Sequence, residues 1–389
     1  MRKQKFIIFG KPFIDKNETR SINNVLNSRW IGTGPIVEKF ENEFSKYKNS
    51  KYALSLNSCT SALHLSILSL GLKKGDEIIT TPLTFCSTIN SILMSNCKPI
   101  LVDIRKDNFN INEELIEKKI TKKTKAILLV HFAGMPCEMD KIKKIAKKYN
   151  LKIIEDCAHA IETEYKNKKT GTFGETGSFS FYANKNITTG EGGMLICQKK
   201  RISDLVKILR LHGMSKDAWK RFFPERNPKK KSFHYDVKYT GYKYNMTDLQ
   251  AALGCSQLKK INTMWLKRKK LYENYLKKLK NLPVFFQKSP YENFKHGYHL
   301  FVFIFDKSRT KKKRDDLMKY LNEKGIGTSV HYRSVTEMSH YQKKLNWKNQ
   351  DCPISYYIGS NTISLPLYPG LKNAEQNYII SEIKKFFNA

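Results

Sequence analysis

Short apolar runs alternate with longer amphipathic segments through the first half of the chain. The runs are rich in Ile, Val and Leu and are bounded by turn-forming or charged residues, which is typical of buried strands. Helical patterns separate most of the first five runs, and this alternation favours a mainly parallel sheet with helices on both faces. Ligands of such sheets lie beyond the carboxyl ends of the strands. The predicted strands are 53–56, 77–80, 99–102, 126–130, 152–155, 178–182 and 194–197.

The pattern is less regular outside this region. Residues 1–20 show no clear periodicity and are expected to form an N-terminal arm. A long helical pattern starts at the cap candidate Thr247 and continues, with a break left open, to about residue 279; its length suggests a bridge between two lobes. The other predicted elements are helices over 21–26, 37–47 and 314–324, strands at 298–305 and 328–331, and a last amphipathic helix through Phe387.

These segments divide the chain into three parts. We predict an N-terminal arm (1–20), a large α/β domain (21–255) and a smaller C-terminal α+β domain (256–389) that begins with the long interdomain helix. The longest apolar runs, such as 126–130, are far shorter than the roughly 20 residues that cross a bilayer. The N-terminus lacks the pattern of a signal peptide. We therefore expect no membrane partner and a cytoplasmic location.

The net charge is strongly positive, +36 from 71 Lys and Arg against 35 Asp and Glu. An excess of this size raises nucleic acid as a partner. The lysines, however, recur along almost every predicted helix, as in 141–148, which is typical of solvated helix faces. We therefore expect no nucleic-acid partner, although a positive field favours an anionic small substrate.

The eight cysteines are scattered, without a CxxC pair or a Cys/His ladder. They are expected to be buried, reduced thiols, and no metal site is predicted. They are Cys59, Cys86, Cys97, Cys137, Cys157, Cys197, Cys255 and Cys352.

The stretch 177–193 contains the strongest candidate for chemistry. A short β run leads to Lys185, and polar turn residues and a glycine-rich bend follow it, so the lysine is expected at the end of a strand. A lone lysine at such a place is more often surface decoration. A lysine that binds a carbonyl group covalently must lose its proton near neutral pH, which burial and neighbouring cations promote. We interpret Lys185 as the residue that holds a cofactor.

An acidic pair and a histidine follow the predicted strand 152–155. Asp156, at the carboxyl end of that strand, is well placed to hold the protonated ring nitrogen of a ligand, and His159 could orient or stack against the same ring. In enzymes that use pyridoxal phosphate (PLP), such a carboxylate keeps the pyridine nitrogen protonated so that the ring acts as an electron sink. The alternative is that Asp156 only caps the next helix.

Polar and aromatic side chains also follow other strands or occupy turns. Thr60 and Ser61 lie at a predicted helix start, where hydroxyls and backbone N–H groups can cradle a phosphate, and an ordinary cap is the alternative. Phe85 follows the next strand and could stack on a flat ring, although a core position is the alternative. Thr33 lies in a glycine-containing turn, which indicates either a site or a plain turn.

Taken in this order, these stretches resemble the PLP-dependent nucleotide-sugar aminotransferases of the DegT/StrS type. The resemblance covers nearly the whole chain. It implies an α/β fold of the fold type I aminotransferases, with a mainly parallel central sheet flanked by helices, a smaller C-terminal α+β domain, and pyridoxal 5'-phosphate as the cofactor. The motifs that carry it are 30–35, 57–64, 130–136, 155–160, the Lys185 segment and 365–370.

The resemblance also implies roles for the matching residues. Lys185 would bind the cofactor covalently and shuttle a proton, and Asp156 would pair with the pyridine nitrogen. One branch of the family has histidine in place of this lysine and dehydrates sugars, so the lysine implies transamination. The other matches are Phe85 stacked on the ring, His159 on the side of the cofactor's 3-hydroxyl, Thr60, Ser61 and Ser180 at the phosphate, and Asn245 at the phosphate of the neighbouring subunit's cofactor. The last match implies a homodimer with shared active sites.

Within the family, the chain is most similar to the subgroup of the UDP-4-amino-4-deoxy-L-arabinose–oxoglutarate aminotransferase. The stretches 130–136, 211–219 and 325–333 carry this likeness and are expected to line the pocket for the sugar and its diphosphate. Solvated surface charge is the alternative for the charged candidates. The candidate substrate contacts are Thr33, Lys220, Arg221, His331 and Arg333.

The expected activity is a transamination in two halves. An amino acid, expected to be L-glutamate, would give its amino group to the enzyme, which would pass it to a keto nucleotide sugar, expected to be a UDP-linked 4-keto sugar, for glycan or lipopolysaccharide synthesis. The alternatives are a 3-keto sugar aminotransferase, or a non-enzymatic regulator or polyanion-binding protein on the same fold.

Overall fold

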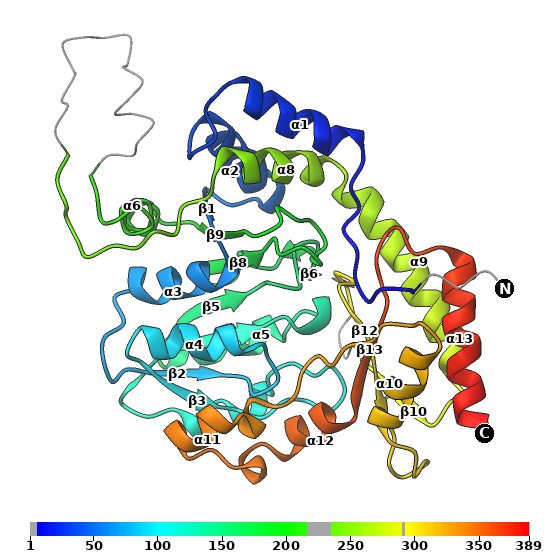
Figure 1. Ribbon diagram of the computed structural model, residues 1–389. Coiled ribbons are helices and arrows are strands. Elements are labelled where there is room, and N and C mark those ends of the chain that lie inside the picture. Colours follow the sequence, from blue (N-terminus) through cyan, green and yellow to red (C-terminus); the bar gives the residue numbers. More distant parts are fainter. Residues whose placement is uncertain (1–5, 216–234, 290–291, 389) are drawn as a thin grey trace.

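A seven-stranded sheet forms the centre of the computed structural model, which describes residues 6–215, 235–289 and 292–388 (Figure 1). Its strands are β1 (Tyr52–Leu56), β2 (Glu77–Thr80), β3 (Lys98–Leu101), β4 (Thr124–Val130), β5 (Lys152–Asp156), β8 (Thr176–Ser180) and β9 (Gly193–Cys197). Their order across the sheet is β1-β9-β8-β5-β4-β2-β3. β9 is antiparallel to both of its neighbours, and all other pairs are parallel. The predicted mainly parallel sheet is therefore confirmed.

The strand bounds agree with the sequence pattern to within about two residues. The largest change is in β8, which ends at Ser180 instead of 182. The chain leaves the ladder there because the loop folds back: the Phe181 N–H donates to Gly192 O at 2.9 Å, and Thr189 N–H donates to Phe181 O at 2.9 Å. Lys185 consequently lies in a loop that follows the strand, not at the strand's last position.

Helices cover both faces of this sheet. Neighbouring strand residues point to opposite faces, so Ile153 of β5 packs in the cluster that contains Ile142, whereas Ile154 packs with Leu63. In Figure 1, α3 and α4 lie in front of the sheet. One face contacts α2 (Pro35–Lys48), α5 (Met139–Lys148) and α8 (Asp248–Lys259), and the other contacts α3 (Cys59–Ser69), α4 (Cys86–Met94) and α6 (Lys200–Leu209).

The C-terminal part of the chain forms a second, smaller sheet with its own apolar core, on the right of Figure 1. Its elements are α9 (Ile261–Leu279), β10 (Val284–Phe286), β12 (Phe301–Phe305), α10 (Arg314–Glu323), β13 (Thr362–Leu365) and α13 (Asn373–Asn388). Every residue of β12 is buried, as its uninterrupted apolar sequence indicates. This layout agrees with a smaller α+β lobe, and the domain boundaries themselves stay a prediction.

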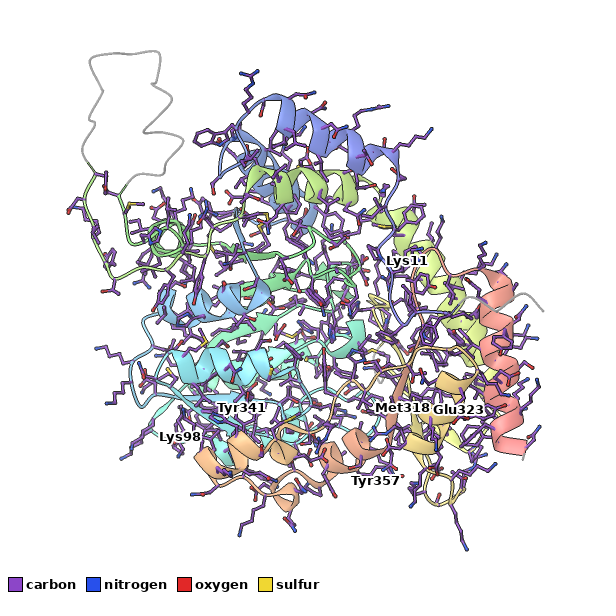
Figure 2. All side chains as sticks on the ribbon, in the orientation of Figure 1. Lys11, Lys98, Met318, Glu323, Tyr341 and Tyr357 are labelled. Atoms are coloured by element: carbon purple, nitrogen blue, oxygen red, sulfur yellow. The ribbon has the colours of Figure 1, made fainter. Side chains whose placement is uncertain are left out.

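Shorter elements join these two bodies. These elements are α1 (Lys16–Asn27), α11 (Ser339–Leu345), α12 (Pro353–Asn361), the three-stranded sheet of β6 (Glu164–Tyr165), β7 (Lys168–Lys169) and β11 (Phe294–Lys295), and the 3-10 turns Glu113–Leu115, Glu117–Lys119, Phe132–Gly134, Val335–Glu337 and Asn349–Asp351. Tyr341 of α11 (Figure 2) contacts α4, where its hydroxyl donates to Asn90 Oδ1 at 2.7 Å.

Two details of the sequence interpretation are corrected, and one that was left open is decided. The first helix begins at Lys16, inside the predicted arm, because Asp15 and Glu18 form a capping box at its N-terminus. The long helical pattern is broken at Lys260, where α8 ends and α9 begins. No strand forms at 328–331, although that stretch is fully described: Ser329 makes only an isolated bridge to Ser364.

Across 6–215, 235–289 and 292–388, we find no helix with the length and apolar character needed to span a membrane.

A buried carboxylate ties β5 to its surroundings. Glu155 Oε1 accepts hydrogen bonds from the N–H groups of Phe173 and Gly174, both at 2.7 Å. Its Oε2 accepts one from Gly171 N–H at 2.6 Å and lies 3.1 Å from His131 Nε2. Burial would raise the pKa of Glu155, but these hydrogen bonds outweigh it and lower the pKa below its ordinary value.

Glu155, His131 and Cys157 also form the kind of group that could hold a metal ion. His131 Nδ1, however, accepts a hydrogen bond from Cys137 N–H at 3.1 Å, so its Nε2 carries the proton and donates it to Glu155. With the Glu155 oxygens and both ring nitrogens engaged, these residues serve the fold.

We predict that Glu155→Gln lowers the free energy of unfolding by about 3 kcal/mol, because an amide N–H would face backbone N–H donors. Urea unfolding at pH 7 measures this. Since the lowered pKa stabilises the fold in full only above the ordinary value of 4.5, the difference from wild type should shrink as the solution is acidified from 4.5 through the folded-state pKa. Glu117→Gln, at a surface ion pair with Lys148, is the control and should change stability by less than about 0.5 kcal/mol. Equal losses in both variants would contradict the assignment.

Candidate active site

A cavity of about 490 Å³ opens beyond the carboxyl ends of the parallel strands. Its walls come from segments far apart in sequence: the residues after β1, β2, β5 and β8, and two stretches of the C-terminal part. The predicted site residues that line it are Thr60, Phe85, Asp156, His159, Ser180, Lys185 and His331.

Lys185 projects into this cavity from the loop after β8. Its own N–H donates to Tyr182 O at 3.0 Å, which closes the turn that carries the side chain. Protein atoms packed around the amine lower the pKa of Lys185 to about 8; the positive charge of Arg268 adds to this, and Cys59 and Asp156 oppose it. A substantial share of the amine is therefore neutral near physiological pH, as a nucleophilic lysine requires.

Asp156 ends β5 at the cavity wall and is only 3% exposed. Its Oδ2 accepts a hydrogen bond from the Thr88 hydroxyl at 2.9 Å, and its Oδ1 accepts one from Ala158 N–H at 3.1 Å. Burial raises the pKa of Asp156, while these two hydrogen bonds and the nearby Lys185 pull it down. The carboxylate is thus held in one orientation by groups that favour its charged form.

His159 lies beside Asp156 as a neutral ring. Its Nδ1 accepts a hydrogen bond from Ala133 N–H at 3.2 Å, so the proton sits on Nε2, which is 3.0 Å from the Tyr332 hydroxyl. Burial, together with Lys185 and His331, lowers the pKa of His159 well below its ordinary value. The ring of Tyr332 stacks on His159 with centroids 5.8 Å apart.

The N-terminus of α3 forms one end of the cavity. The Ser58 hydroxyl caps the helix by accepting from Ser61 N–H at 3.1 Å, and the Ser61 hydroxyl donates to Asn57 Oδ1 at 2.6 Å. Ser61 is therefore buried in the turn, and Thr60 faces the cavity. The turn packs so closely on β9 that a Cβ on Gly193 would lie 2.3 Å from the Ser58 carbonyl carbon, which only glycine avoids.

Two aromatic rings stand at the mouth of the cavity. Phe85 is 56% exposed and is therefore not a core residue, and its ring centroid lies 5.9 Å from that of Tyr332. The exposed Tyr182 lines the same cavity. Phe side chains are usually buried in a folded protein. An exposed Phe ring beside a cavity is available to stack on a bound ring.

Other predicted site residues lie elsewhere. Thr33 and Asn245 line a second cavity, of about 410 Å³, where Asn245 Nδ2 donates to the Thr33 hydroxyl at 2.6 Å. Arg333 points outward, with 54% of its side chain exposed, and pairs with Glu337 at 3.3 Å. Lys220 and Arg221 fall outside the described residues.

The structure adds residues that the motifs did not single out. Thr88 holds Asp156, Tyr332 meets His159, and His299 Nε2 lies 3.5 Å from Lys185 Nζ. Tyr332 lies inside the marked stretch 325–333, and Thr88 follows Phe85 by three positions. Their hydrogen-bonding side chains are the signal that could have identified them. His299 has no such local signal, because it comes from the loop before β12.

A cavity beyond the carboxyl ends of a mainly parallel sheet, lined by a lysine and a buried carboxylate, agrees with the fold type I architecture of aminotransferases that use pyridoxal phosphate. The chain belongs to the DegT/DnrJ/EryC1/StrS aminotransferase family, which it matches over residues 12–384.

Several proteins that it resembles are named as aminotransferases or as polysaccharide biosynthesis proteins. It is 38% identical to the spore coat polysaccharide biosynthesis protein SpsC of Bacillus subtilis, over 98% of this chain and 97% of SpsC. It is 31% identical to Helicobacter pylori PseC, an aminotransferase involved in the biosynthesis of pseudoaminic acid, with a TM-score of 0.91 over 99% of this chain and 100% of PseC.

Spr1654 of Streptococcus pneumoniae, named as a sugar aminotransferase, is 30% identical in its PMP form, with a TM-score of 0.90 over 98% of this chain and 99% of the other. Its PLP form has also been solved, with a TM-score of 0.89. These findings give a PLP-dependent sugar aminotransferase.

The residues around the cavity fit this cofactor. A carboxylate, an exposed aromatic ring, an amine of lowered pKa and a helix N-terminus surround one space, which matches the needs of a pyridine nitrogen, a flat ring, a carbonyl carbon and a phosphate.

We predict that Thr88→Val weakens PLP binding about tenfold, because Asp156 loses a hydrogen bond that holds its charged form in place. Titration of the cofactor-free protein with PLP, followed by absorbance, measures the dissociation constant. Ser95→Ala is the control. Ser95 directly follows α4, the helix that contains Thr88, and its buried hydroxyl donates to Ser91 O. Its loss should leave the dissociation constant of PLP unchanged. Equal affinity of Thr88→Val and wild type would remove Thr88 from this role.

Proposed function

We propose that this enzyme transfers the amino group of L-glutamate to a UDP-linked 4-keto sugar, giving an amino sugar for a surface glycan or lipopolysaccharide. The observation that carries the proposal is the Lys185 and Asp156 pair in one cavity of a sugar aminotransferase fold. The printed roles of SpsC and PseC, in polysaccharide and pseudoaminic acid synthesis, support a sugar destined for a glycan. The choice of UDP and of the fourth carbon rests on the likeness of 130–136, 211–219 and 325–333 to the 4-amino-sugar subgroup.

Lys185 and Asp156 carry the chemistry in this proposal. Bound PLP supplies an electron sink, which makes the proton on the carbon next to the transferred nitrogen removable. Lys185 Nζ, with its pKa lowered to about 8, would take up that proton from the carbon on one side of the nitrogen and deliver it to the carbon on the other side. Asp156 is anchored by Thr88 and Ala158, and holds the proton on the pyridine nitrogen.

The other cavity residues bind and orient. Thr60, Ser61, Ser180 and the N–H groups at the start of α3 hold the phosphate, with Ser61 acting through the turn that it stabilises. His159, fixed by Ala133 N–H and Tyr332, orients the 3-hydroxyl side of the ring. Phe85 stacks on that ring.

The second cavity supports the proposed homodimer with shared sites. Asn245 and Thr33 are hydrogen-bonded to each other there and do not line the Lys185 cavity. This separation supports the proposal that they serve a neighbouring subunit's cofactor and substrate. In the same proposal, His331 lines the substrate end of the cavity, and Lys220, Arg221 and Arg333 meet anionic groups of the nucleotide sugar.

The partners of the protein are thus a nucleotide sugar, an amino acid and a second copy. The positive charge of +36 then serves to attract anionic substrates, and neither nucleic acid nor a membrane is needed. A cytoplasmic location remains part of the proposal.

A panel of keto nucleotide sugars with L-glutamate as donor tests the substrate. We predict amination of a UDP-4-keto sugar at least about tenfold faster, in kcat/KM, than of 3-keto or dTDP-linked sugars, because the pocket would be complementary to one transition state. Detection of 2-oxoglutarate and of the amino sugar by mass spectrometry measures both halves of the reaction.

Lys185→Ala is the control, which should give neither product. Preference for a 3-keto sugar would overturn the assignment of the ring carbon, and amination with other donors only would overturn the role of glutamate.

Mixing two inactive variants tests the shared sites. Lys185→Ala and Asn245→Ala should each lose most activity. If each site takes Lys185 from one subunit and Asn245 from the other, random reassortment should restore about a quarter of wild-type activity, since half of the dimers are hybrids with one intact site each. The measurement is the glutamate-dependent rate after mild unfolding and refolding of the mixture. Restoration below a few per cent would contradict sharing.

A further inference from the structure

A chain of buried polar side chains runs from Glu162 through Asn186 and His299 to Lys185. Asn186 Nδ2 donates to Glu162 Oε2 at 2.8 Å and to Gly297 O at 2.7 Å. Asn186 Oδ1 lies 3.0 Å from His299 Nδ1, and His299 Nε2 lies 3.5 Å from Lys185 Nζ. Glu162, Asn186 and His299 are each at most 5% exposed. The motifs and the proposed mechanism leave all three without a role.

The hydrogen bonds fix the orientation of the Asn186 amide and the tautomer of the His299 ring. Gly297 O can only accept, so the side of Asn186 that faces it must be the NH2 group. Asn186 Oδ1 therefore faces His299 and accepts the proton of Nδ1. In the neutral ring the Nε2 lone pair is then left to face Lys185. Because Gly297 O does not titrate, this orientation holds whether or not Glu162 is ionised.

The backbone around His299 is held by close packing. Gly297 N–H donates to Gly134 O at 2.8 Å, and a Cβ on Gly134 would lie 3.0 Å from the Cα of Gly297. Arg268, from α9, donates to His299 O at 3.4 Å and to Leu367 O at 2.8 Å. The loop before β12 is thereby fastened to the large sheet and to the small one, which leaves His299 little freedom to move away from Lys185.

We propose that Glu162, Asn186 and His299 form a positioning chain that fixes His299 in the tautomer with its Nε2 lone pair toward the Lys185 amine. The proposal rests on the proposed role of Lys185 as the proton carrier. When Lys185 takes up a proton, one N–H of the ammonium group points at His299 Nε2. The three residues of this positioning chain therefore orient the Lys185 amine and stabilise its protonated form while Lys185 Nζ holds the proton.

The other ionisable groups around Lys185 come from several elements. Asp156 ends β5 and Cys59 begins α3, and both favour the charged amine, whereas Arg268 of α9 disfavours it. Burial lowers the pKa of His299 well below its ordinary value, and the positive charges of Lys185 and Arg268 add to this. Burial also lowers the pKa of His331 to about 3. The ring that faces Lys185 is consequently neutral, and a neutral ring has one lone pair to offer.

The test measures the pKa of Lys185 in the cofactor-free full chain, by competitive acetylation with acetic anhydride across pH and quantification of the Lys185 peptide. The wild-type value is expected near 8. His299→Phe removes the acceptor but keeps a ring of similar size, and we expect the pKa of Lys185 to fall by about one unit. His299→Gln, whose Oε1 can accept, should recover at least half of that fall.

His296→Phe is the matched control. His296 is a buried histidine three positions earlier in the same loop, bonded to Tyr298 N–H and Gln287, and should leave the Lys185 pKa unchanged. An unchanged pKa in His299→Phe, or equal shifts in both variants, overturns the proposal. A rise would show that His299 donates to Lys185, which is the opposite tautomer.

The tautomer can also be observed without any variant. Two-bond ¹H–¹⁵N correlation spectra of wild-type protein labelled with ¹⁵N-histidine should show the His299 proton on Nδ1, and a proton on Nε2 overturns the proposal. Both measurements read the resting protein, so they are independent of whether Lys185 later proves to bind PLP.

Discussion

The shared direction of the strands is the constraint on which the site depends. Because all strands of the seven-stranded sheet except β9 run the same way, their carboxyl ends meet at one edge, and the residues that follow them come together from positions far apart in the chain. Asp156, Lys185 and Thr60 are neighbours for this reason alone. The antiparallel β9 returns the chain after the Lys185 loop and lies between β8 and β1, so that Gly193 packs against the turn at the start of α3. The strand β9 thus brings the end of the Lys185 loop into contact with the N-terminus of α3.

A second requirement is that the amine at this edge be able to lose and regain a proton. Packed protein atoms and Arg268 favour its loss, and the carboxylate of Asp156 favours its return. The histidines around the cavity add no positive charge, because burial keeps His159, His299 and His331 neutral. The balance places the pKa of Lys185 at about 8, close enough to neutrality for the lysine to act in both directions.

The sequence predicts the large sheet and one half of the cavity well, because both depend on local signals. Apolar runs mark the strands, and the polar residues that follow each run mark its carboxyl end, which is how Asp156, Lys185, Thr60 and Phe85 were found. The first helix was predicted to start at 21 and not at Lys16, because few of its residues are apolar and its start depends on a capping box with Glu18. The expected strand at 328–331 is instead a single bridge beside Ser364.

The other half of the cavity depends on tertiary structure. His299 and Tyr332 reach Lys185 and His159 only because the small lobe packs against the large sheet, and no spacing along the chain reports that contact. Arg333 was chosen for its charge and faces outward, whereas its neighbour Tyr332 faces inward. Thr33 and Asn245 meet in a cavity of their own, which is separate from the one that Lys185 lines.

The central claim is that Lys185 is the residue that carries the cofactor. Borohydride reduction of the PLP-loaded protein, followed by digestion and mass spectrometry, tests it most directly. The account predicts that the reduced cofactor is found on Lys185 and on no other of the many lysines of this chain. Attachment to a different lysine, or an active enzyme in which Lys185 stays unmodified, would contradict it.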